Sequence, residues 1–195
     1  MVLTMGQLRA RSDQAKADRR LHILGCAAAV CAVSGYDELT VSDVADRAGV
    51  AKGTVFRYFP TKEDLGRALA AQHLRRWADD LDRRLARLPG PPAPDTAARV
   101  LVESLAGRRD LLVLAARGLV PADALDEARA APALEAALPY LGEGGGGGRL
   151  MRTALASAAG LRATLAEEAA LPAELHHALR AHLAGLRSAQ QRASV

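Results

Sequence analysis

Residues 52–58, which read KGTVFRY, combine side chains of the kinds that proteins use to hold DNA. Lys52 and Arg57 are cations, of which Lys52 is expected to approach base edges and Arg57 to hold a phosphate. Thr54 and Tyr58 carry hydroxyls that form hydrogen bonds with phosphate oxygens or base edges. These side chains can contact DNA together only when a rigid helix holds them on one of its faces. The flanking sequence must therefore form and support that helix.

The flanking sequence predicts two short helices joined by a tight turn. Thr40 suits the N-cap of a helix over 41–48, and Asp43, three residues later, comes close to the capping-box pattern. Gly49 follows this helix directly, where a left-handed residue commonly ends a helix. With a second helix over 52–58, the segment predicts a helix-turn-helix whose second helix reads the major groove. An ordinary pair of surface helices with a glycine stop has the same local pattern.

The apolar residues of both helices recur at helical spacing and mark the inner faces: Val44, Ala45, Ala48, Val55 and Phe59. The polar residues of 52–58 are then free to face outward. Gly53 lies among them and, having no Cβ, allows the backbone to approach DNA closely.

A longer segment, residues 20–65, resembles the N-terminal DNA-binding domain of the TetR family of transcriptional regulators, and it covers about a quarter of the chain. The motifs that carry the resemblance are Gly35-Tyr36, Thr40-Val41, Ala48-Gly49-Val50, Gly53-Thr54-Val55, Tyr58-Phe59 and Lys62-Glu63-Asp64-Leu65. The resemblance implies an all-helical homodimer with a small N-terminal DNA-binding domain. It also implies a larger C-terminal domain for ligand binding and dimerisation.

The helix-turn-helix and the resemblance together define the expected DNA-binding residues: Thr40, Ser42, Lys52, Gly53, Thr54, Phe56, Arg57, Tyr58 and Lys62. Three positions depart from the family pattern. Ala51 replaces the usual capping serine, and Phe56 replaces a tyrosine whose hydroxyl contacts phosphate. Cys31 stands where a buried phenylalanine is common. The first two departures bear on the DNA contacts, and the third bears on packing.

The sequence divides into three parts: a flexible basic arm over 1–17, the DNA-binding domain over 18–66 and a C-terminal domain over 67–195. The helices expected from periodicity and caps cover about 18–34, 41–48, 52–58, 61–88, 96–106, 108–118, 121–130, 132–141, 149–169 and 172–189. A proline-rich break over 89–94 and the glycine run over 142–148 mark loops.

The net positive charge of the chain lies in its N-terminal part. Residues 1–88 hold 15 Lys and Arg against 11 Asp and Glu, a net charge of +4, which is the formal net charge of the whole chain. Residues 89–195 are balanced, with 11 of each. Phosphate binding predicts this asymmetry, although so modest a charge also occurs for solubility alone.

The C-terminal part offers a dimer interface and a ligand pocket. The last two expected helices present small and leucine side chains that suit a four-helix bundle between two subunits, at Leu155, Ala158, Leu175, Leu179 and Leu183. These faces could instead be buried within their own subunit. The pocket should be mostly apolar, and its candidate contacts by position are Trp77, Glu103, Arg117 and Tyr140.

These features favour a homodimeric repressor that a small apolar ligand releases from a palindromic operator. A TetR-like activator and a helical interaction protein that has lost DNA binding are the alternatives. No nucleophile motif, nucleotide loop or metal-ligand spacing points to an enzyme, so we expect no cofactor and no metal. The five histidines are interpreted as solvated helix faces, and Cys26 and Cys31 as buried apolar residues. The apolar run 23–33 is too short to span a membrane, so we expect a cytoplasmic protein with no membrane partner.

Overall fold

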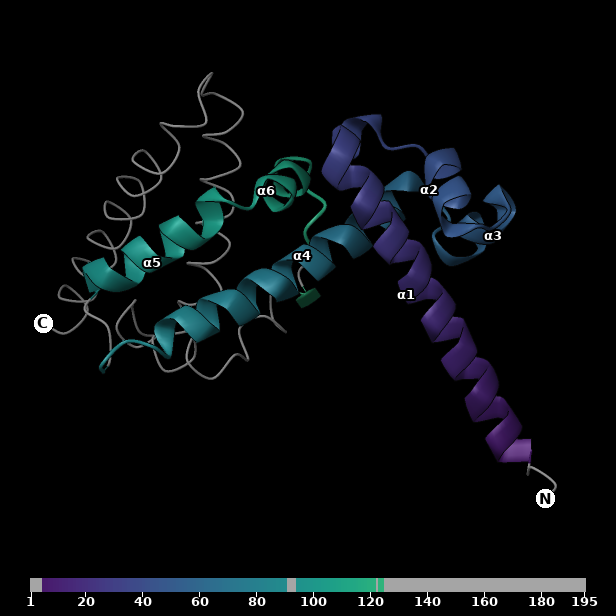
Figure 1. Ribbon diagram of the computed structural model, residues 1–195, viewed down its shortest axis with the longest axis horizontal. Helices are drawn as coiled ribbons and strands as arrows, with labels where there is room; N and C mark the ends of the chain where they lie inside the picture. The colour runs from purple at the N-terminus through teal and green to yellow at the C-terminus, as the bar shows by residue number, and fades with distance from the viewer. Residues whose placement is uncertain (1–4, 91–93, 122, 125–195) are drawn as a thin grey trace, which may run out of the picture. The chain divides into compact units, whose positions relative to one another are not determined.

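The computed structural model describes residues 5–90, 94–121 and 123–124, whose regular structure is entirely helical (Figure 1). The helices are α1 (Met5–Glu38), α2 (Val41–Ala48), α3 (Lys52–Tyr58), α4 (Lys62–Leu85), α5 (Pro94–Ala106) and α6 (Arg109–Ala116). The chain divides into two compact units between Leu69 and Ala70, inside α4 and close to the predicted domain boundary. The predicted all-α fold is therefore confirmed.

Helix α1 begins at Met5 rather than near residue 18, so residues 5–17 are helical where the sequence predicted a flexible arm. The segment lacks an apolar face, but after Gly6 it contains neither glycine nor proline, and its Ala, Arg, Gln, Leu and Lys are good helix formers. One turn is tied by a hydrogen bond in which Gln14 Nε2 donates to Asp18 Oδ1 at 2.7 Å. Intrinsic propensity thus extends the helix beyond the part that buries side chains.

The first unit is built on α1, whose residues Ile23, Leu24, Ala27 and Cys31 form a buried stripe. Helix α2 packs against both α1 and α3. His22 of α1 lies with Nε2 3.2 Å from the carbonyl oxygen of Ala48, at the end of α2. The packing and this polar contact hold the helix-turn-helix on α1.

The C-terminal end of α1 is interrupted at Gly35, whose φ of 81° and ψ of 165° are not helical. A residue with a side chain rarely adopts this φ, so glycine suits the bend. The chain turns here, and Tyr36 and Leu39 after the bend are buried in the first unit. This bend agrees with the predicted end of the first core helix at about residue 34.

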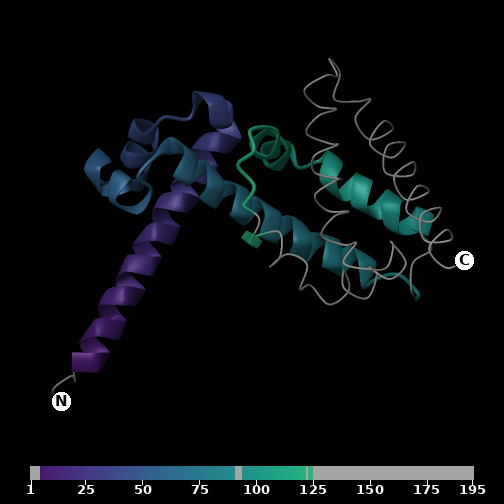
Figure 2. The same cartoon turned by 180° about the vertical axis from the view of Figure 1, so that it is seen from behind.

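The second unit contains residues 70–85 of α4 together with α5 and α6, which Figure 2 shows from behind. Trp77 is fully buried, and its indole Nε1–H donates to Ser104 Oγ at 2.8 Å. The Ser104 hydroxyl in turn donates to the carbonyl of Leu101 at 2.8 Å. This chain of hydrogen bonds satisfies the buried polar atoms that join α4 to α5.

A second polar contact of this unit joins α4 to the start of α6. Asp80 accepts from Arg84 at 2.9 Å and forms an ion pair with Arg108 at 3.0 Å. Burial raises the pKa of Asp80, but the hydrogen bonds from Arg108 and Arg84 outweigh it and lower the pKa below its ordinary value. Asp80 therefore remains charged at neutral pH as the acceptor at this junction.

Helix boundaries agree with the predictions at α2 and α3 and differ by a few residues at α4, α5 and α6, whereas α1 is longer at its start. Helix α4 ends at Leu85 and continues as turns to Leu88, while α5 begins at Pro94. The expected helices over 132–141, 149–169 and 172–189, the glycine run over 142–148 and the five dimer-interface residues lie outside the described residues. Within the described part of the chain, no helix combines the length and apolar character needed to cross a bilayer.

Candidate nucleic-acid interface

The turn between α2 and α3 is set by local hydrogen bonds. Thr40 Oγ1 accepts from the Asp43 backbone N–H at 3.2 Å, while Asp43 Oδ2 accepts from the Thr40 backbone N–H at 3.3 Å and from its hydroxyl at 2.6 Å. This is a complete capping box at the start of α2. Gly49 ends the helix with φ 64° and ψ 37°, the left-handed conformation. The predicted cap and glycine stop are both confirmed.

Helix α3 is anchored by two apolar side chains, Val55 and Phe59, which are 0% and 1% exposed. Arg20 of α1 lies over the Phe59 ring, with its guanidinium carbon 4.8 Å from the ring centroid. The preceding residue, Ala51, makes no side-chain cap, as expected. Tertiary burial rather than a strong N-cap therefore holds this seven-residue helix.

With that face buried, α3 presents the remaining side chains to solvent. Lys52, Gly53, Phe56 and Arg57 are exposed, and Thr54 is partly exposed. Phe56 is 40% exposed, so its ring is available for contact with a sugar or a thymine methyl. Tyr58 is partly exposed too, with the Arg57 guanidinium carbon 5.7 Å from its ring centroid. The structure thus brings together six of the nine predicted DNA-binding residues on one short helix.

The other three predicted residues lie at helix starts and have structural partners or partial burial. Thr40 is the N-cap of α2, and Ser42 in its first turn is partly exposed. Lys62, at the start of α4, donates from Nζ to the Asp37 carbonyl at 2.8 Å. Lys62, which the sequence predicted as a DNA-binding residue, thus braces α1 against α4.

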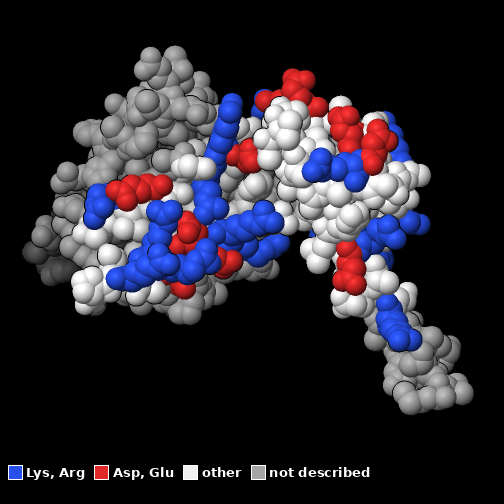
Figure 3. Space-filling model, in the orientation of Figure 1, with Lys and Arg blue, Asp and Glu red and all other residues white. Residues whose placement is uncertain are grey.

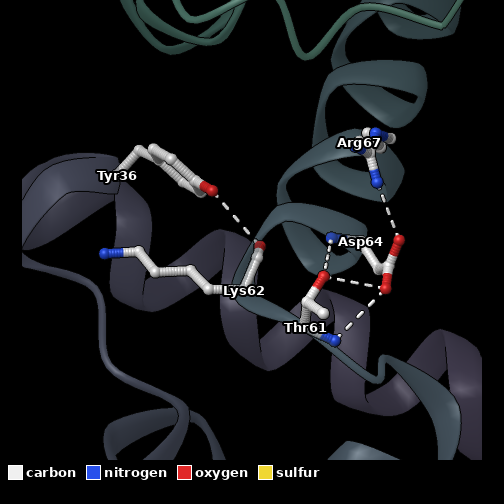
Figure 4. Close-up of polar contacts among 5 residues, drawn as sticks. All are labelled: Tyr36, Thr61, Lys62, Asp64 and Arg67. Atoms are coloured by element: carbon white, nitrogen blue, oxygen red, sulfur yellow. Dashed lines mark hydrogen bonds and ion pairs between the residues drawn. The ribbon is translucent and has the colours of Figure 1, made fainter.

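A second capping arrangement opens α4 (Figure 4). Thr61 Oγ1 accepts from the Asp64 backbone N–H at 3.0 Å, and Asp64 Oδ2 accepts from the Thr61 hydroxyl at 2.8 Å. Arg67 pairs with the other oxygen of Asp64 at 2.8 Å. The Thr61 hydrogen bond is the main cause that lowers the pKa of Asp64, and Arg67 adds to it. The predicted cap at Thr61 is confirmed.

A feature that the sequence analysis missed lies between α1 and α3. An open hollow of about 630 Å³ is lined by Ser12, Ala15, Lys16, Arg19, Val50, Ala51, Thr54, Arg57 and Tyr58. The spacing of the first four residues would have placed them on one face of a helix. This spacing led to no predicted site, because residues 1–17 were expected to form a flexible arm rather than a helix.

The candidate ligand residues of the second unit fall into different environments. The polar atom of Trp77 is already paired with Ser104, so the indole acts as a buried packing element. Glu103 is exposed and pairs with Arg99 at 3.3 Å. Arg117 is exposed at the end of α6, and Tyr140 lies outside the described residues.

Two neighbouring side chains of α4 stand out instead, because Gln72 Oε1 and His73 Nε2 are buried without a hydrogen-bond partner. Burial lowers the pKa of His73; Asp110 opposes this shift, while Arg76 and Arg108 add to it. The interpretation of His73 as a solvated helix face is therefore wrong. Its position on the amphipathic α4 could have indicated burial, but its unpaired nitrogen depends on the tertiary structure.

Comparison with known proteins agrees with this geometry. The sequence pattern of "Bacterial regulatory proteins, tetR family" matches residues 23–69. The HTH-type transcriptional repressor KstR of Mycobacterium tuberculosis is 44% identical over 53 residues, which are 27% of this chain and 24% of the relative. KstR of Rhodococcus jostii is 37% identical over 79 residues, 40% of this chain and 35% of the relative. The chain therefore spans only about a quarter to a third of the length of these curated relatives.

Solved structures extend the likeness to most of the chain. The TetR-family repressor FadR of Thermus thermophilus, in complex with lauroyl-CoA, is 26% identical, with a TM-score of 0.52, and the match covers 83% of this chain and 91% of that one. AlkX of Dietzia, a TetR-family repressor, shares the fold at 18% identity, with a TM-score of 0.56 and coverage of 86% and 96%. Residues 23–69 therefore belong to the tetR family of bacterial regulatory proteins, and the chain has the helical fold of TetR-family transcriptional regulators.

Proposed function

We propose that the chain is a sequence-specific transcriptional repressor that binds a palindromic operator as a homodimer and leaves it when a small apolar ligand binds. The observation that carries the proposal is α3, whose buried Val55 and Phe59 leave a basic and aromatic face exposed. A helix of this kind, supported by a preceding helix, can enter the major groove in one register. The similarity of the first unit to repressors favours repression over activation and over a scaffold without DNA binding.

Within this interface, Lys52 and Thr54 contact base edges, while Arg57 and Tyr58 contact phosphates. Phe56 packs against a sugar or a thymine methyl, because it has no hydroxyl to donate. Lys62 donates one N–H to the Asp37 carbonyl, and the other N–H groups of its ammonium reach phosphate. Thr40 and Ser42, at the start of α2, contribute to the phosphate contacts.

The ligand that we propose first is a fatty acyl thioester, because the 26% identical FadR of Thermus thermophilus was solved with lauroyl-CoA. A long apolar chain also suits a domain rich in alanine and leucine. Gln72 and His73 supply the polar anchors, since Gln72 Oε1 and His73 Nε2 are buried without partners. Leaving such atoms unpaired costs about 1–3 kcal/mol each, and a ligand that pairs with them recovers part of that free energy.

This arrangement suggests how ligand and operator are coupled. Helix α4 carries Lys62 at its start and the proposed anchors Gln72 and His73 about three turns later, in the second unit. A ligand that binds these anchors biases the position of α4 and thereby the spacing of the two reading heads of a dimer. It can do so only through its different affinities for the two states, typically about 1–3 kcal/mol.

The first test is selection of duplexes from a random-sequence DNA pool with the purified chain. We expect a near-palindrome with half-sites about one helical turn apart, and a complex of two chains per duplex by light scattering. The double variant Lys52→Ala, Arg57→Ala is the control and should enrich no sequence. Failure of the unmodified chain to enrich any sequence would overturn the assignment as a DNA-binding regulator.

The ligand is tested separately with lauroyl-CoA. Calorimetric titrations with and without the selected duplex should give a lower lauroyl-CoA affinity on DNA, by the same factor by which lauroyl-CoA weakens DNA binding. Gln72→Leu and His73→Leu should both weaken the binding of lauroyl-CoA, while the surface variant Arg75→Leu should leave it unchanged. Equal affinity with and without DNA would show that lauroyl-CoA is not the effector.

A further inference from the structure

The hollow between α1 and α3 has walls from two parts of the first unit. Ser12, Ala15, Lys16 and Arg19 come from the N-terminal part of α1. They follow the i, i+3, i+4, i+7 spacing that places side chains on one face of a helix. The opposite wall is formed by the turn after α2 and by α3 itself: Val50, Ala51, Thr54, Arg57 and Tyr58.

The lining of this hollow is cationic and rich in hydroxyls. It contains three cations, Lys16, Arg19 and Arg57, and no carboxylate. The hydroxyls of Ser12, Thr54 and Tyr58 add hydrogen-bond donors. The small side chains of Ala15 and Ala51 leave space between the two walls. Cations that share a hollow without an anion repel one another, so the site favours an anion that bridges them.

The carboxylates of the same stretch of α1 are directed elsewhere. Asp13 and Asp18 are not among the residues that line the hollow, and Asp18 accepts a hydrogen bond from Gln14. Figure 3, which shows one face of the molecule, has basic side chains both on the α1 stem and beside α3. The face of α1 toward α3 is therefore positive even though the helix carries both signs of charge.

From this geometry we propose that the hollow receives a phosphodiester strand of DNA, so that the N-terminal part of α1 forms a second DNA contact beside α3. The inference rests on the proposed function, because the wall formed by Thr54, Arg57 and Tyr58 is also part of the reading helix. The inference goes beyond the proposed function, because residues 12–19 lie before the segment 23–69 that matches the family, and they add a DNA contact outside the helix-turn-helix.

A strand of DNA suits the hollow better than a small anionic ligand does. Residues 11–20 of α1 are all exposed, so the hollow is open along its helical wall. Pockets for small molecules enclose most of the ligand surface, whereas a backbone strand needs an open and positive path. Phosphate contacts of this kind add affinity and fix the register of α3, without reading the base sequence.

The test uses two alanines of the same helix as a matched pair. Ala15 lines the hollow, while Ala17 is also exposed, does not line it and lies about 200° around the helix from Ala15. Ala15→Glu should weaken binding to the selected duplex about tenfold or more at low salt, because it places a carboxylate beside the phosphates. Ala17→Glu should stay within about twofold of the unmodified chain. Circular dichroism should show equal helix content for both variants.

Charge removal gives a second readout. Lys16→Ala and Arg19→Ala should each lower the slope of log affinity against log salt by about 1, with the base preference of the selected site unchanged. A change in base preference would assign these residues to base reading and overturn the proposed phosphate role. Equal affinities for Ala15→Glu and Ala17→Glu, in a chain that still binds its duplex, would overturn the inference alone. Loss of duplex binding by the unmodified chain would instead overturn the proposed function.

Calorimetric titration with inorganic phosphate, in the absence of DNA, distinguishes a small free anion from a DNA strand as the occupant of the hollow. Phosphate binding that Arg19→Ala abolishes, combined with unchanged duplex affinity of that variant, would identify a small-anion site and overturn the DNA strand as occupant. Weaker duplex binding by Arg19→Ala, with no measurable phosphate binding to the unmodified chain, supports the strand.

Discussion

Tyr36 contacts Lys62, 26 residues later in the sequence, in two ways: through the backbone of the lysine and through its side chain. The Tyr36 hydroxyl donates to the Lys62 carbonyl at 3.2 Å, and the Lys62 ammonium lies 5.1 Å from the centroid of the Tyr36 ring (Figure 4). The same ammonium donates to the Asp37 carbonyl at 2.8 Å. These contacts join the end of α1 to the start of α4 in the first unit, beside the proposed DNA-binding surface.

The two tyrosines of this unit should separate stability from DNA binding. Tyr36 is 7% exposed and its hydroxyl has a protein partner, so Tyr36→Phe should lower the free energy of unfolding by about 1 kcal/mol and leave duplex affinity nearly unchanged. Tyr58→Phe removes a partly exposed hydroxyl from α3 and should weaken duplex binding without a comparable loss of stability. Urea unfolding and fluorescence anisotropy measure the two effects. Equal effects of both substitutions on both measurements would contradict the division of roles.

Thr54 and Lys62 should differ in what they contribute to DNA recognition. Thr54→Ala should relax the base preference at one position of each half-site by about 1 kcal/mol or more. Lys62→Ala should weaken binding to all duplexes alike and lower the salt slope by about 1, because a phosphate contact carries no sequence information. Titrations against the selected duplex and a scrambled duplex, at several salt concentrations, provide the comparison. An unchanged duplex affinity of Lys62→Ala at low salt would leave this lysine as a structural brace only.

The uncapped start of α3 offers a stabilising substitution. Ala51 occupies the N-cap with φ −66° and ψ 146°, the extended conformation that a capping serine adopts, but has no side-chain oxygen. Ala51→Ser should therefore raise the free energy of unfolding by about 0.5–1 kcal/mol. Ala17→Ser, in the middle of α1, is the matched control and should lower it slightly, because serine is a poorer helix former than alanine. No gain at position 51 would mean that the orphan N–H groups of α3 are satisfied by water.

Stability should depend on pH through His73. Burial is the main cause that lowers the pKa of His73 in the folded chain, below the value of about 6.5 of an unfolded histidine. Between the two values the unfolded state binds more protons than the folded state, so the free energy of unfolding rises with pH. The contribution is complete above about pH 6.5 and is lost as pH falls below that value. Urea unfolding across pH 5–7 should show this slope in the unmodified chain and a flatter one in His73→Gln; equal slopes would contradict the assignment to His73.

The features that depend on residues close together in the chain were predictable from the sequence. The bounds of α2 and α3, the capping box of Thr40 and Asp43 and the left-handed Gly49 all follow from interactions within about one helical turn. The cap at Thr61 follows in the same way. These local signals, with the alternation of buried and exposed positions, determined the helix-turn-helix and the side of α3 that faces outward.

Helix α1 shows where local reasoning was incomplete. Its first turns have no apolar periodicity, which predicts a flexible arm, yet their composition is strongly helix-forming. Periodicity reports burial, and an exposed helical extension needs none. The error concealed the face that carries Lys16 and Arg19.

What remained for the tertiary structure to decide involves pairs that are far apart in the chain. Lys62 meets Asp37 across 25 residues and Trp77 meets Ser104 across 27, and neither partner could be chosen from local pattern. The buried atoms of Gln72 and His73 and the hollow between α1 and α3 likewise depend on which helix faces come together. The sequence by itself determined the local elements and their exposed chemistry, because short-range hydrogen bonds and side-chain periodicity suffice for them. Only packing decided whether each polar group met a protein partner, lay buried without one or faced an open hollow, because side-chain environments depend on distant contacts.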